Sequence, residues 1–112
     1  MRSAGRPRVH AWARFTVGAA GVVTLDEAFS DPGITLGTFS SGVAALSFPS
    51  CPKAIVKAFH RPAAVGNDQH IYVSAQSDTA GTATLTVHDD GSAEDPADGA
   101  VIVVEIVAET RG

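Results

Sequence analysis

The densest group of potential metal ligands in this sequence is an acidic segment at residues 89–99, which reads DDGSAEDPADG. Its carboxylates belong to Asp89, Asp90, Glu94, Asp95 and Asp98. Carboxylate oxygens are ligands that Ca²⁺ prefers, but a twelve-residue calcium loop needs them at alternating positions with a final glutamate. This segment lacks that spacing. We therefore interpret it as a solvated acidic turn, with Ca²⁺ binding as the alternative.

Histidine and cysteine offer little chemistry at a recognisable spacing. The histidines are His10, His60, His70 and His88. They are far apart in the sequence, and none has a partner at metal-ligand spacing except His88, which precedes Asp89 and Asp90. We therefore expect neither a metal site nor a cofactor. Cys51 could act as a nucleophile only if the fold brought a histidine base to it. Its place in a proline-flanked loop favours a packed thiol, and a single cysteine excludes an internal disulfide.

The common catalytic motifs are absent from the sequence. It has no glycine-rich phosphate loop, no GxSxG elbow and no HExxH zinc motif. We therefore predict that the protein is not an enzyme, and a small hydrolase is the weaker alternative. There is also no run of about 18 apolar residues, and the first 30 residues lack the apolar core of a signal peptide. We expect neither a transmembrane segment nor a secretion signal.

The charges are distributed unevenly along the chain. The net charge is −4, yet Arg2, Arg6, Arg8 and Arg14 precede every acidic residue and leave residues 15–112 at −8. Residues 1–8, MRSAGRPR, have no apolar periodicity, and we interpret them as an extended basic arm. Nucleic-acid binding or a transit peptide would explain the arginines less well. We expect the arm to contact another copy of the chain or an acidic supporting surface.

Residues 9–112 have the composition and periodicity of one β-domain. Apolar residues alternate with polar ones in short segments, and turn residues interrupt them every 8 to 12 positions. Strands are expected at residues 9–17, 22–25, 34–39, 43–48, 53–60, 71–75, 82–88 and 100–109. About eight strands predict a single antiparallel, jelly-roll-like β-sandwich. The apolar run at 100–109 is typical of a strand buried near the middle of a sheet.

Residues 33–48, GITLGTFSSGVAALSF, form the clearest predicted hairpin. Ser40, Ser41 and Gly42 supply the turn, because glycine accepts a positive φ without a Cβ clash. In the first arm the alternation places Ile34 and Leu36 on one face and Phe39 on the other. A turn of three residues leaves the register open by one position.

Two segments of the first half resemble bacteriophage tail-fibre proteins and related small virion proteins. The resemblance rests on an AW-x-x-F strand followed by a glycine-containing turn, a Phe-Ser pair and a hairpin. The matching residues are Ala11, Trp12, Phe15, Phe29, Ser30, Ile34, Gly42, Leu46 and Phe48. The acidic, proline-containing loop and the apolar last strand are similar to the endings of such proteins.

This resemblance implies a non-enzymatic virion structural protein that is oligomeric, usually trimeric, and made in the host cytoplasm. The length fits a capsid-decoration or fibre-tip subunit bound to a larger capsid or tail protein. We expect Arg2, Arg6, Arg8, Trp12 and Arg14 to take part in the interaction, with no role for nucleic acid or membrane. The alternative is a carbohydrate-binding or adhesin-like sandwich that contacts host glycans.

Overall fold

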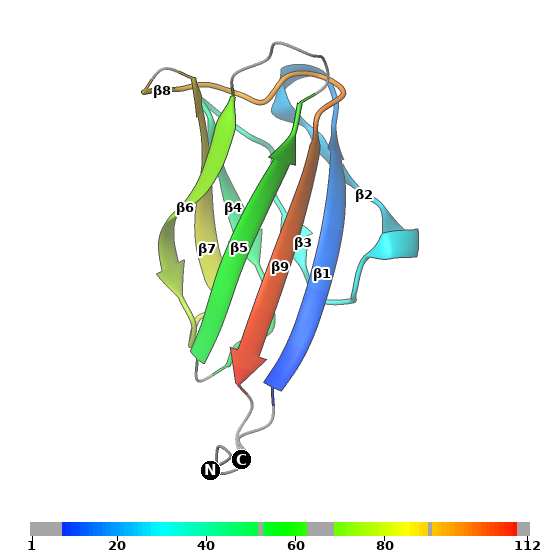
Figure 1. The fold of residues 1–112 in the computed structure, drawn as a ribbon, viewed down its shortest axis with the longest axis vertical. Coiled ribbons are helices and arrows are strands. Elements are labelled where there is room, and N and C mark those ends of the chain that lie inside the picture. Colours follow the sequence, from blue (N-terminus) through cyan, green and yellow to red (C-terminus); the bar gives the residue numbers. More distant parts are fainter. Residues whose placement is uncertain (1–7, 52, 63–68, 90, 110–112) are drawn as a thin grey trace.

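A computed structural model describes residues 8–51, 53–62, 69–89 and 91–109. Within these ranges the chain forms two antiparallel β-sheets packed against each other, as Figure 1 shows. This arrangement confirms the predicted all-β sandwich. Two short 3-10 helices, η1 (Ala19–Gly21) and η2 (Glu27–Phe29), interrupt the first connections.

The strands fall into two sheets, which we call sheet A and sheet B. Sheet A has the order β2-β1-β9-β5 and contains β1 (Arg8–Val17), β2 (Val23–Leu25), β5 (Lys53–Arg61) and β9 (Val101–Glu109). Sheet B has the order β3-β4-β7-β6, with β8 beside β7. Its strands are β3 (Thr35–Leu36), β4 (Val43–Ser47), β6 (His70–Ser77), β7 (Thr82–Asp89) and β8 (Ser92–Ala93). All the predicted strands are present, and β8 is an additional one.

The core lies between the two sheets and is built mainly from alternate residues of the longer strands. On β1, Phe15 and Val17 are buried, whereas Trp12 and Thr16 face outward. The last strand, β9, pairs with both β1 and β5 and is thus central in sheet A, as its apolar run predicted. The largest fully buried side chains come from both sheets and the loops, namely Phe15, Phe39, Ile34, Leu46, Leu85 and Ile102.

The hairpin of β3 and β4 has a tighter turn than expected. Ser41 (φ 50°) and Gly42 (φ 83°) are its two central residues, and Ser40 and Val43 exchange both backbone hydrogen bonds across it. Positive φ at both central positions is the type I′ geometry, whose twist matches that of the flanking strands. Leu36 pairs with Leu46, which resolves the open register.

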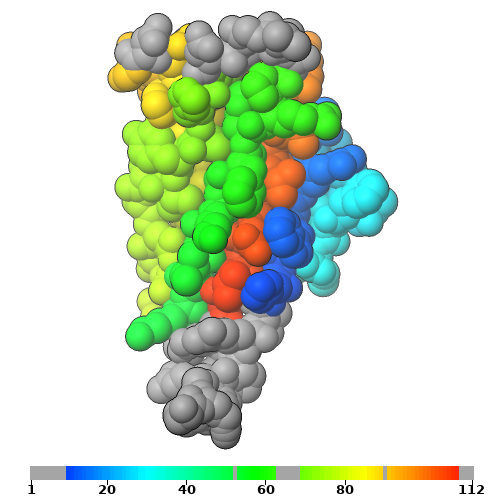
Figure 2. Space-filling model, in the orientation of Figure 1, coloured from blue at the N-terminus to red at the C-terminus, as the bar shows by residue number. Residues whose placement is uncertain are grey.

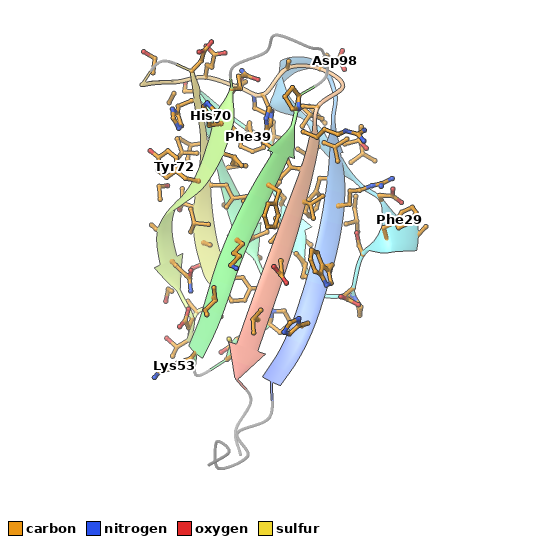
Figure 3. All side chains as sticks on the ribbon, viewed as in Figure 1. Phe29, Phe39, Lys53, His70, Tyr72 and Asp98 are labelled. Atoms are coloured by element: carbon orange, nitrogen blue, oxygen red, sulfur yellow. The ribbon has the colours of Figure 1, made fainter. Side chains whose placement is uncertain are left out.

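The predicted orientation of Phe39 is wrong. Phe39 is buried in the core with Ile34, and Figure 3 shows it between the sheets. The strand pairing of β3 stops at Leu36, and the backbone N–H of Phe39 donates to the carbonyl oxygen of Gly21. The period-two alternation therefore ends before this side chain is placed.

The N-terminal arm lies mostly outside the described residues. β1 begins at Arg8, where the arm was predicted to end, and its first described pair is Arg8 with Glu109 of β9. In the part of the chain that the structure describes, no helix has the length and hydropathy to cross a membrane.

Candidate interaction surface

The outer face of sheet A, here called the A face, gathers side chains from β1, β9 and β5. Strand pairing places these side chains in rows across the sheet. The rows are His10, Val107 and Ile55; then Trp12, Glu105 and Lys57; then Arg14, Val103 and Phe59. Figure 2 looks onto this face, with β5 in green, β9 in orange-red and β1 in blue.

Large apolar side chains stand exposed on the A face. Ile55 is 59% exposed, Phe59 48% and Trp12 44%. Val103 and Val107 lie between them on β9 and are partly exposed. Scattered apolar residues are normal at a protein surface, but apolar side chains gathered on one sheet face indicate an interaction site.

Charged groups divide this apolar surface. Glu105 lies in the middle row between Trp12 and Lys57, and its side chain is only 16% exposed. Nδ1 of His10 is 3.9 Å from a carboxylate oxygen of Glu105. The A face thus presents a partly buried anion at its centre, with Lys57 beside it on β5.

The segment between β2 and β3 covers part of the outer edge of β1. The backbone N–H of Trp12 donates to Oδ2 of Asp31 at 2.7 Å, and the N–H of Asp31 donates to the carbonyl oxygen of Trp12 at 2.7 Å. Further along, the N–H of Arg14 donates to Oγ of Ser30 at 3.0 Å. Uncovered strand edges invite pairing with other chains, and this one is occupied by its own loop.

The opposite edge of sheet A is covered in a similar way at one end. The backbone N–H of Ala54 on β5 donates to Oδ2 of Asp78 at 3.1 Å, and its carbonyl oxygen accepts from Nε2 of Gln76 at 2.9 Å. Both partners come from the end of β6 and the turn after it. These contacts restrict edge-to-edge association at this end of β5.

Arg14 is held within its own domain. Its Nε and Nη2 atoms donate to Oδ2 of Asp26 at 3.1 and 2.7 Å, and its guanidinium carbon lies 4.3 Å from the ring centroid of Phe29. Phe29 extends from η2 beside sheet A in Figure 3. Arg14 therefore ties η2 to β1, and its charge is already paired.

The structure places the other predicted interaction residues as follows. Arg2 and Arg6 lie outside the described residues, and of Arg8 only the backbone is described. Trp12 is on the A face. Sequence reasoning missed Ile55 and Phe59, although their alternation with Ala54, Val56 and Ala58 contained a signal. If the small alanines face the core, the large apolar residues must face outward.

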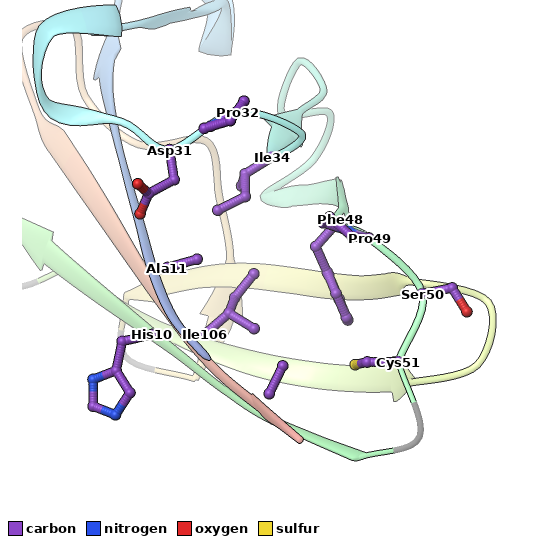
Figure 4. A pocket seen from close by; sticks show the side chains of 11 residues that line it. His10, Ala11, Asp31, Pro32, Ile34, Phe48, Pro49, Ser50, Cys51 and Ile106 are labelled. Atoms are coloured by element: carbon purple, nitrogen blue, oxygen red, sulfur yellow. The ribbon is translucent and has the colours of Figure 1, made fainter. Parts of the chain in front are cut away.

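A cavity of about 350 Å³ opens between the sheets where β1 begins and β9 ends, as Figure 4 shows. Ala11, Ile34, Phe48 and Ile106 contribute apolar walls, and Cys51 lies at its edge. Burial raises the pKa of the Cys51 thiol, and the negative charge of Asp78 adds to this effect. The thiol is thus kept in its protonated, less nucleophilic form.

The acidic segment is built into the fold. Oδ1 of Asp95 accepts a hydrogen bond from the N–H of Gly42 at 2.7 Å, and Oε2 of Glu94 accepts one from Nε2 of Gln69 at 2.6 Å. Gln69 is buried and also accepts from the N–H of Ala97. Among the described residues, no three histidine, cysteine or acidic side chains converge on one point. The carboxylates of Glu94 and Asp95 thus hold a loop closed.

His60 faces the core side of β5 near the end of the sandwich. Both of its ring nitrogens are buried, and neither makes a hydrogen bond of ordinary geometry with a described residue. Burial lowers the pKa of this imidazole, the nearby His70 lowers it further, and the backbone of Gln69 partly opposes the change. The surroundings of His60 therefore favour its neutral form.

The chain was compared with family models, curated proteins and solved structures. No family model, no curated protein and no solved structure matches it. The grounds for a functional proposal are the A face and the resemblance of the first half of the sequence to virion proteins.

Proposed function

We propose that this chain is a non-enzymatic structural protein of a bacteriophage particle and that it self-associates, as a homotrimer, through the A face. The observation that carries the proposal is the exposure of Trp12, Ile55 and Phe59 on one sheet face. Aromatic side chains are enriched at the anchoring points of protein interfaces. The virion assignment draws on the resemblance of the first half of the sequence to tail-fibre and related small virion proteins.

The chemistry of the A face favours a second copy of the same chain as its partner. The face carries Lys57 and Glu105 side by side, so a rotated copy can set its lysine against the other copy's carboxylate. Between these charges the apolar side chains of both copies would pack together. The covered stretches of the sheet edges favour contact through the face over strand addition.

The basic arm gives the assembly a second point of attachment. Arg2, Arg6 and Arg8 precede or begin β1, and the remainder of the chain from residue 15 carries a charge of −8. In an assembly, the arm of one copy lies close to the acidic body of another or to a larger capsid or tail component. Electrostatic attraction of this kind speeds association and sets orientation.

Charge introduced into the A face should abolish self-association. A double variant, Ile55→Lys with Phe59→Lys, would bury unpaired positive charge at the interface, and we expect its association constant to fall about 100-fold or more. Sedimentation velocity at tens of micromolar should give three times the 11.4 kDa chain mass for the wild type and the monomer mass for the variant.

The matched control is Val43→Lys, because Val43 is 41% exposed on the outer face of sheet B. This variant should assemble as the wild type does. A wild-type chain that sediments as a monomer, or a double variant that still forms trimers, would contradict the role of the A face.

The virion assignment requires a separate test. The chain should co-purify with gradient-purified particles of the phage that encodes it, and mass spectrometry should detect it in several copies per particle. Antibodies against the folded chain should label the particle surface in electron micrographs. If intact particles contain none of the chain, it is not a virion protein, whatever its state of association.

A further inference from the structure

Two histidines that are far apart in the sequence meet on the outer face of sheet B. His70 of β6 pairs directly with His88 of β7, and their ring centroids are 5.7 Å apart with an angle of 40° between the planes. Tyr72 packs edge-on against His88, with centroids 5.3 Å apart. Figure 3 shows His70 and Tyr72 on the solvent side of sheet B.

The separation of the two rings suits a shared metal ion. Bonds from imidazole nitrogen to a zinc ion measure about 2.0–2.1 Å, so two imidazoles on one ion have centroids about 5 to 6 Å apart. The observed 5.7 Å falls in this range. A shared ion requires that side-chain rotation, without movement of the strands, direct one nitrogen of each ring toward a common point.

The ring nitrogens are available for such an ion. Within the described residues, the ring of His88 contacts the rings of His70 and Tyr72, and His70 also lies near His60; no hydrogen bond to the ring of His70 or His88 is found. Imidazole ligands suit Zn²⁺, Cu²⁺ and Ni²⁺, whereas Ca²⁺ and Mg²⁺ prefer oxygen ligands. The two imidazoles would therefore bind a transition-metal ion in preference to Ca²⁺ or Mg²⁺.

We propose that His70 and His88 form a two-histidine site for a divalent transition-metal ion such as Zn²⁺, Ni²⁺ or Cu²⁺. Water completes the coordination, since no third histidine, cysteine or acidic ligand converges with them among the described residues. The site is thus open and exchangeable. It lies on the sheet opposite the A face, so it is independent of the proposed assembly.

Metal binding at this position stabilises the pairing of an exposed edge strand of the sandwich. β6 is the last strand of sheet B, and its pairing with β7 is interrupted by an irregularity between Val73 and Ala75. An ion held by one histidine from each strand cross-links β6 to β7 beyond this irregularity. Because the unfolded chain does not hold the two rings together, the ion stabilises the folded state.

The test uses the full chain without a histidine tag and ZnCl₂ or NiCl₂ alone as the probe. Either metal at 100 µM should raise the melting temperature by several degrees, whereas CaCl₂ or MgCl₂ should leave it unchanged. In calorimetric titrations, His70→Ala and His88→Ala should each bind Zn²⁺ at least tenfold more weakly than the wild type. The control His10→Ala, on the opposite sheet, should keep wild-type affinity.

Nuclear magnetic resonance tests the site in the wild-type chain, so its result does not depend on whether a variant folds. Small additions of Ni²⁺ should broaden the resonances of His70, Tyr72 and His88 before those of His10. The proposal is overturned if transition metals leave the melting temperature unchanged, if His10 broadens first, or if the affinity for Zn²⁺ survives both substitutions. None of these results depends on whether the chain trimerises.

Discussion

Replacement of Gly42 by alanine is expected to lower the free energy of unfolding by about 3 kcal/mol or more, and the melting temperature by roughly 10 °C. Gly42 has a φ of 83°, which disfavours any residue with a Cβ atom. An alanine Cβ would also lie 2.5 Å from the backbone nitrogen of Glu94 and 2.7 Å from the carbonyl oxygen of Val87. Both neighbours are backbone atoms, so the clash requires β7 or the acidic loop to move.

The same movement would break hydrogen bonds that join three parts of the chain. The N–H of Gly42 donates to Asp95 at 2.7 Å, and its carbonyl oxygen accepts from the N–H of Val87 at 2.8 Å. The hairpin turn, β7 and the acidic segment therefore share one tightly packed junction. Equilibrium urea unfolding of Gly42→Ala measures the combined cost.

Gly91→Ala is the matched control for this prediction. Gly91 has nearly the same φ, 82°, but a Cβ there would meet no atom within 4 Å. Its substitution should lower the free energy of unfolding by only about 1 kcal/mol, the cost of a positive φ in a residue with a Cβ atom. If the two variants lose equal stability, the close approach at Gly42 contributes nothing and our account of the junction is wrong.

Most of the fold could be predicted because it depends on local alternation. Strands such as β1 and β7 bury alternate residues on one face, Ala13, Phe15 and Val17 in β1 and Ala83, Leu85 and Val87 in β7. Period-two patterning therefore specifies both the element and its orientation. The burial of Phe39 could not be predicted, because its position depends on a hydrogen bond to Gly21, eighteen residues earlier. The pattern of a strand carries no information beyond the point where its pairing stops.

The candidate sites depend on register and on which face is buried, and these were harder to infer. Trp12 could be singled out from its polar strand face, but Ile55 and Phe59 needed a choice between two faces of β5. The meeting of His70 with His88 depends on the pairing of β6 with β7 across an irregularity. Sequence spacing alone therefore made these two histidines seem unrelated.

The two outer faces of the sandwich differ in kind, and this difference supports separate roles. The A face combines aromatic, aliphatic and charged side chains, whereas the outer face of sheet B, beside the exposed Val43 and Tyr72, carries several hydroxyl residues. These residues are Ser47, Ser74, Thr82, Thr84 and Thr86. Hydroxyl side chains are readily hydrated, and burial of apolar area supplies the main driving force of association. The A face is accordingly the side expected to be covered in an assembly.

Two substitutions, Phe15→Ala and Trp12→Ala, should distinguish the role of the buried face of β1 from that of its exposed face. Phe15 is 1% exposed in the core, and its truncation should cost about 3–5 kcal/mol, a large part of the 5–15 kcal/mol that holds a small domain folded. Trp12 is 44% exposed, so its truncation should cost the monomer about 1 kcal/mol or less. Urea unfolding at low protein concentration measures both values without a contribution from assembly.

For self-association, in contrast to stability, the substitution of Trp12 should have a larger effect than the substitution of Phe15. Trp12→Ala removes a central anchor of the A face and should weaken association about 30-fold, a loss of roughly 2 kcal/mol. Phe15→Leu, which retains most of the buried volume, should regain more than half of the stability lost in Phe15→Ala and trimerise as the wild type does. A Trp12→Ala chain that unfolds as readily as Phe15→Ala would mean that Trp12 supports its own core. In that case β1 would not offer an assembly surface, because both of its faces would serve the fold.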